Sequence, residues 1–273
     1  MTATWALFRK NLLDARWMLG TIGLALFGLS WLFVHVAHRI EAAMKEVTGG
    51  GPPLRMLRGL GGAAMDFSTA AIEMAFWNHP FVLLMFAVWA IARGTASVAG
   101  EIERGTMDLI LSRPVTRFAY LSAQVLSALF GLALLGASMV AGNLVGSQYN
   151  TLADPPSVLI LSKPALNLFA FGAAIYGYTL FCSTVDLVRW RPNLIASVAT
   201  LAGFIALVIA NIPSLEDYKW LEHFSIFKAY NPVEVVTQGK TLAFNAGILG
   251  TIGTIGLVLS FTCFLRRDLP AGS

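Results

Sequence analysis

Six long apolar runs constrain the fold of this chain more than any other feature. Each is close to or above the roughly 20 residues that a helix needs to cross a hydrocarbon layer of about 30 Å. They cover residues 17–37, 80–99, 118–146, 164–185, 193–212 and 241–265, and their only formally charged side chain is Arg93. Charged residues make up 12% of the whole chain, against roughly 25% in a soluble domain. We therefore predict an all-α integral membrane protein in which residues 1–273 form one transmembrane domain.

The basic residues divide unevenly between the two sides that these spans define. One side carries ten of them in short segments, namely Arg9, Lys10, Arg16, Arg104, Arg113, Arg117, Arg189, Arg191, Arg266 and Arg267. The other side carries eight in longer loops that also hold nine acids. Because short cytoplasmic loops are enriched in Lys and Arg, both termini are expected in the cytoplasm. We interpret the net charge of +4 as topology and contact with membrane lipids, not as nucleic-acid binding.

Three segments outside the spans have amphipathic or aromatic patterns. Residues 1–16 place Trp5, Phe8 and Leu12 broadly on one face, which predicts a helix lying in the membrane interface. Residues 54–77 form a weakly amphipathic stretch on the outer side, interfacial or re-entrant, and residues 213–240 form an outer helical region rich in aromatic side chains. Proline at 164 stands where we expect the fourth span to begin.

A charged segment with helix-breaking residues, residues 100–117, separates the second and third spans. Gly105 and Pro114 bracket a short apolar piece that contains Met107, Leu109, Ile110 and Leu111. A helix between these two residues has about two turns and is marginal in water by itself. The membrane or a partner protein is therefore expected to provide the surface on which the apolar piece packs.

Patterns for catalysis or for a cofactor are absent from the sequence. It contains no GxSxG, no HExxH and no phosphate loop of the GxxxxGK type, so we predict a chain that is not an enzyme and holds no cofactor. His35, His38 and His79 fall on the outer side, where they suit either a metal or haem site or, more typically, boundary positions at the interface.

Polar residues inside the spans are candidates for a transport pathway. Arg93 either extends to the nearby interface, pairs with Glu101 or Glu103, or lines a pathway. Gln124 and Asn143 of the third span suit either a substrate route or helix–helix contact. A secondary transporter is an alternative, although it typically shows sequence repeats, which we do not find. The last span carries Gly247, Gly250, Gly253 and Gly256, and we expect Gly250 and Gly253 to lie against another helix.

Residues 99–124 read AGEIERGTMDLILSRPVTRFAYLSAQ. They resemble the cytoplasmic loop of permease subunits from type-2 ATP-binding-cassette (ABC) exporters. In those subunits an acidic residue, a Glu-Arg-Gly-Thr cluster, a leucine-rich piece and Ser-x-Pro-x-x-Arg follow the second span. Residues 223–236, HFSIFKAYNPVEVV, are similar to a Ser-Pro-Phe-x-Tyr-x-x-Pro stretch of some members, with Ile226 in place of the proline.

The resemblance implies a permease in the cell membrane, paired with a second copy or with a different permease. It further implies two cytoplasmic ATPase subunits, which would bind ATP and magnesium in place of this chain. A coupling helix would dock on the ATPase through Glu101, Glu103, Arg104, Gly105, Thr106, Met107, Leu109, Ile110, Leu111, Arg113 and Pro114.

Overall fold

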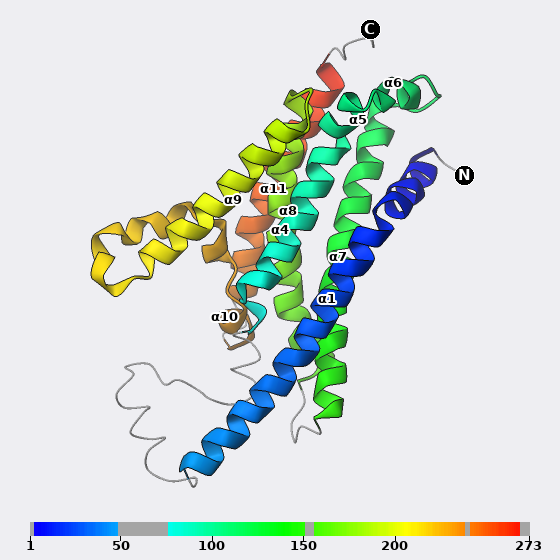
Figure 1. Cartoon of the computed structure of the whole chain (residues 1–273). Coiled ribbons are helices and arrows are strands. Elements are labelled where there is room, and N and C mark those ends of the chain that lie inside the picture. Colours follow the sequence, from blue (N-terminus) through cyan, green and yellow to red (C-terminus); the bar gives the residue numbers. More distant parts are fainter. Residues whose placement is uncertain (1–2, 49–75, 151–155, 238–240, 268–273) are drawn as a thin grey trace.

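The computed structural model describes residues 3–48, 76–150, 156–237 and 241–267, and within them every regular element is a helix (Figure 1). The long helices are α1 (Ala3–Thr48), α4 (Pro80–Ser97), α7 (Arg117–Tyr149), α8 (Val158–Val185), α9 (Trp190–Ala210) and α11 (Thr241–Arg266). The short ones are α5 (Ala99–Glu103), α6 (Thr106–Leu111), α10 (Pro232–Thr237) and the 3-10 helices η1 (Pro213–Phe224) and η2 (Ile226–Ala229). The predicted all-α class is confirmed.

The six long helices are also long and apolar enough to cross a membrane, as expected from the six runs. The fourth begins earlier than predicted, because the hydroxyl of Ser157 caps it by accepting a hydrogen bond from the Ile160 amide at 3.3 Å. Pro164 consequently lies inside α8. There it leaves one backbone carbonyl of the preceding turn without its helical partner.

The predicted interfacial helix, residues 1–16, is not separate from the first span. Both belong to α1, which runs unbroken from Ala3 to Thr48. The reason is local, since neither glycine nor proline occurs between Ala3 and Leu19, and an ion pair of 3.4 Å joins Lys10 to Asp14 one turn apart.

The core lies where α4, α7 and α8 pack together (Figure 1). The indole of Trp89 fills a space that Gly131 leaves open, since a Cβ at Gly131 would lie 2.1 Å from the Trp89 ring. The indole also donates a hydrogen bond of 3.1 Å to the Ala128 carbonyl. Helix α1 packs mainly along α7 and helix α11 along α8, while most of the surface of α9 is exposed.

Helices α8 and α11 meet at a contact that we call the glycine seam, formed by Gly177 of α8 and by Gly253 and Gly256 of α11. A Cβ at Gly177 would lie 2.5 Å from the Gly253 carbonyl oxygen, and one at Gly256 would lie 2.4 Å from the Gly177 carbonyl carbon. Our expectation is thus confirmed for Gly253 and wrong for Gly250, which has no atom within 4 Å of an added Cβ in the described part of the chain. The buried face of α11 follows positions 245, 249, 253, 256, 260 and 264, and residue 250 lies beside it.

Residues 213–237 fold into η1, η2 and α10 at the end of α9. The side chains of η1 are not buried, whereas Phe227 of η2 packs against Phe171 and Phe204 at ring-centroid distances of 4.9 and 5.5 Å. Ser225 ties this region to α9 by donating a 2.7 Å hydrogen bond to the Gly203 carbonyl. Most of the predicted outer stretch, residues 54–75 of 54–77, lies outside the described residues. Residues 238–240, the last of the predicted outer region 213–240, also lie outside them.

Candidate functional site

One end of the helix bundle gathers most of the basic segments (Figure 1). Helices α5 and α6, the connection from α8 to α9, the carboxyl end of α11 and the first turns of α1 all lie there. The predicted coupling segment falls on α5 and α6, which we treat together as the α5–α6 unit, residues 99–111. This end is the candidate functional site.

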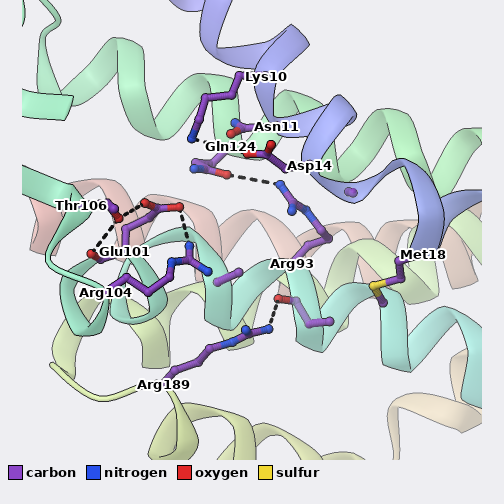
Figure 2. A pocket seen from close by; sticks show the side chains of 13 residues that line it. Lys10, Asn11, Asp14, Met18, Arg93, Glu101, Arg104, Thr106, Gln124 and Arg189 are labelled. Atoms are coloured by element: carbon purple, nitrogen blue, oxygen red, sulfur yellow. Dashed lines mark hydrogen bonds and ion pairs between the residues drawn. The ribbon is translucent and has the colours of Figure 1, made fainter. Parts of the chain in front are cut away.

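The turn of the α5–α6 unit is closed by a single buried carboxylate. Glu101 is 8% exposed, and it accepts a hydrogen bond of 2.6 Å from Arg104 and another from the hydroxyl of Thr106 (Figure 2). Between these two donors Gly105 adopts a φ of 68°, in the left-handed region that glycine enters without steric cost. The sequence EIERGT therefore folds into two short helices joined by a fixed corner.

A hydrogen bond attaches this unit to α8, and others join the end of α4, which leads into the unit, to α7 and α8. The buried hydroxyl of Ser183 in α8 accepts a hydrogen bond of 2.9 Å from the Ala99 amide and donates one of 3.2 Å to the Thr95 carbonyl. The hydroxyl of Tyr120 in α7 donates to the carbonyl of Ser97. Movement of the unit is thereby linked to three membrane helices.

Three arginines add hydrogen bonds at this end of the bundle. From the sequence, Arg189 and Arg267 were only topology signals, while Arg117 also belongs to the Ser-x-Pro-x-x-Arg motif. Arg189 donates to the Ala92 carbonyl at 3.3 Å, while its own amide donates to Glu103 at 3.1 Å. Arg267 donates to the Thr184 carbonyl at 2.6 Å, and Arg117 donates to backbone carbonyls at the end of α11. Their acceptors are main-chain atoms far away in sequence, so no residue pattern identifies them.

The apolar piece of the unit is covered differently from what we expected. Met107 is 2% exposed and belongs to the core, and Ile110 and Leu111 are partly buried against the same core. The prediction that the membrane or a partner supplies their surface is wrong for these three, because the helix folds back onto its own bundle. Leu109 is the exception, at 68% exposure.

The remaining predicted docking residues vary in exposure. Glu103, Arg104, Gly105, Arg113 and Pro114 are exposed, and Thr106 is intermediate. Leu109 therefore stands on a surface with charges of both signs, which is a composition suited to contact with another protein.

Of the three predicted pathway residues, the structure brings two together. The guanidinium of Arg93 donates to the Gln124 carboxamide oxygen at 3.5 Å and lies 6.0 Å from the centroid of the Trp89 ring. Among the described residues Arg93 forms no ion pair with Glu101 or Glu103. Asn143 lies 19 residues beyond Gln124 on α7, about 28 Å away at helical rise, and accepts a hydrogen bond from the hydroxyl of Ser147.

Two of the three histidines predicted on the outer side form hydrogen bonds within the chain. His35 shares a hydrogen bond of 2.8 Å with Asn150, and His79 caps α4 by accepting from the Phe81 amide at 3.3 Å. In the described ranges no group of three His, Cys, Asp or Glu side chains is close enough to hold a metal ion.

Six helices long and apolar enough to span a membrane, with a short helical projection at one end, define a polytopic membrane protein. A comparison with protein families identifies the class of membrane protein. The model of the ABC-2 family transporter protein matches residues 35–269, so the chain belongs to that family and is a permease subunit of an ABC transporter. Permeases of this family work with an ABC ATP-binding subunit. No curated protein matches the chain in sequence.

Proposed function

We propose that this permease provides the translocation pathway of an ATP-driven exporter in the cell membrane, and that the α5–α6 unit docks in a cleft of its cytoplasmic ATPase subunit. The observation that carries this proposal is Leu109, an apolar side chain left 68% exposed on a unit that is otherwise fixed by buried hydrogen bonds. Covering a water-facing leucine at this position with a partner surface stabilises the complex.

The orientation follows from the same end of the molecule. Short basic segments gather around the α5–α6 unit, and such segments mark the cytoplasmic side. Both termini and the docking surface then face the ATPase. The translocation pathway would form between two permeases, either two copies of this chain or this chain and a different one.

Coupling in this arrangement needs no chemistry from the permease. Closure of the ATPase on ATP and magnesium displaces the α5–α6 unit, and the attached ends of α4, α7 and α8 move with it. The permease then contributes two conformations whose balance shifts with the state of the ATPase.

Leu109→Glu tests the docking role in the complex of permease and ATPase. Covering a leucine side chain is worth about 1.5–3 kcal/mol, so its loss weakens association about tenfold or more. We expect loss of ATPase pull-down and of permease-stimulated ATP hydrolysis, with normal membrane insertion. Ile110 is left unchanged because it is partly buried.

The matched control is Leu159→Glu, an exposed leucine near the start of α8 at the other end of the bundle. It introduces the same charge without touching the docking surface and should leave ATPase binding intact. Retained binding and stimulation in Leu109→Glu would refute the docking role.

A further inference from the structure

A cavity of about 360 Å³ lies between residues 10–18 of α1, the ends of α4 and α7 and the α5–α6 unit. Polar side chains from several elements line it, while Ala15 and Met18 of α1 contribute apolar surface (Figure 2). Leu109, on which the docking proposal rests, is not among its lining residues.

The two carboxylates of this cavity already have cationic partners. Asp14 is 3.4 Å from the Lys10 ammonium, and Glu101 is 2.6 Å from Arg104. Arg93 has no carboxylate within 4.0 Å in the described part of the chain. Its one hydrogen bond there, to the neutral amide of Gln124, is long at 3.5 Å. A guanidinium has five N–H donors, so Arg93 brings uncompensated charge and unused donors into the cavity.

Asn11 adds a second unused donor from the facing helix. Its side chain lines the cavity, is 5% exposed, and its amide nitrogen has no hydrogen-bond acceptor among the described residues. A buried donor without an acceptor is costly. The last torsion of asparagine is broad, so this amide can turn toward an acceptor placed in the cavity.

We propose that the cavity binds a phosphate group. Arg93 on α4 and Asn11 and Lys10 on α1 approach from two sides, and a phosphate offers several oxygens to donors that arrive from different directions (Figure 2). Gln124 has a positioning role, since its oxygen accepts from Arg93 while its nitrogen donates to Tyr120 at 3.0 Å.

The depth of the site favours a phospholipid headgroup as the source of this phosphate. Arg93 lies four residues before the end of α4 at Ser97, about 6 Å at helical rise. Basic side chains at that depth meet lipid headgroups. A soluble phosphate would use the same donors, so the test separates the two sources.

Binding to the purified full-length chain is measured by native mass spectrometry with phosphatidic acid and with diacylglycerol, the same lipid without its phosphate. We expect the unaltered chain to prefer phosphatidic acid by about tenfold or more, which corresponds to loss of charge-assisted hydrogen bonds in the second lipid. Arg93→Gln should abolish the preference. Arg9→Gln, an exposed arginine on the same helix as Lys10 and Asn11, should preserve it within about twofold.

A second arm uses millimolar inorganic phosphate against chloride at equal ionic strength, read as thermal stability in detergent. Stabilisation of the unaltered chain but not of Arg93→Gln, without a lipid preference, supports the site and assigns it to soluble phosphate. If Arg93→Gln does not fold, the double variant Lys10→Gln with Asn11→Ala takes its place. A preference for phosphatidic acid that Arg93→Gln retains in full, or no response of the unaltered chain to either phosphate source, overturns the proposal. Neither arm involves the ATPase, so failure of the docking role leaves this test unaffected.

Discussion

At the glycine seam no side chain separates the backbones of α8 and α11, whereas side chains hold the α5–α6 unit to the same bundle. Gly177 and Gly256 allow the two backbones to approach because they lack a Cβ. Glu101 closes the unit by accepting hydrogen bonds from Arg104 and Thr106, and Ser183 of α8 holds it by accepting one from the Ala99 amide of α5. The seam is therefore sensitive to added volume and the unit to removed polar atoms. The first arrangement fixes two membrane helices, and the second fixes the projection that we propose meets the ATPase.

The largest expected effect comes from adding one methyl group at the seam. In Gly256→Ala the new Cβ would lie 2.4 Å from the Gly177 carbonyl carbon, and a main-chain atom cannot move aside cheaply. We expect a loss of about 3 kcal/mol in unfolding free energy, measured by denaturation in detergent micelles.

Gly247→Ala is the matched control on the same helix, where an added Cβ has no atom within 4 Å in the described structure. It should be neutral or stabilising by up to about 1 kcal/mol, because alanine favours helix over glycine. Equal stability of the Gly256→Ala and Gly247→Ala variants would show that α8 and α11 do not approach as closely as described.

Removing the carboxylate at the centre of the α5–α6 unit should have a smaller, local effect. Glu101→Ala leaves Arg104 and Thr106 without their shared acceptor. We expect about 2 kcal/mol of local destabilisation, because hydrogen bonds to charged groups contribute about 1.5–3 kcal/mol and Arg104 is half exposed to solvent.

Hydrogen exchange resolves this effect by region. The amides of α6 should exchange about tenfold faster or more, while those at the glycine seam stay protected. Glu101→Gln retains an acceptor for Thr106, so its α6 amides should exchange at a rate between those of the unaltered chain and of Glu101→Ala. Equal loss of protection at the seam would contradict the independence of the two regions.

The sequence predicted these two regions unequally. Hydropathy alone located all six spans, and Gly105 with Pro114 marked the α5–α6 unit, because both signals are local. The glycine series indicated close packing but not which side of α11 faces α8, so Gly250 was misassigned. The attachment of Arg117 and Arg189 was missed, since their acceptors are backbone carbonyls 97 to 150 residues away.

The continuous α1 was missed for a different reason. The amphipathic pattern of residues 1–16 correctly indicated a helix, but amphipathicity by itself does not say where a helix ends. The absence of a helix-breaking residue gives that information, since no glycine or proline precedes Gly20 within α1. Cavity residues Lys10 and Asn11 consequently sit on the same rigid helix as the first span.

Ser183→Ala is expected to have the smallest effect and tests the point where the two regions meet. Ser183 lies on the seam helix α8, and its hydroxyl is the acceptor for the first amide of α5. Alanine leaves that amide without a partner in a buried position, at a cost of about 1 kcal/mol.

The matched control is Ser162→Ala, at an exposed position of α8 where the hydroxyl bonds within its own helix at 2.8 Å. It should change stability by less than about 0.5 kcal/mol. Because Ser183 joins α8 to α5, its loss should raise exchange in α5 and lower permease-stimulated ATP hydrolysis while the seam stays protected. Unchanged exchange in α5 would mean that Arg189 and the packing of Met107 suffice to hold the unit, and that motion of the ATPase reaches α8 by another route.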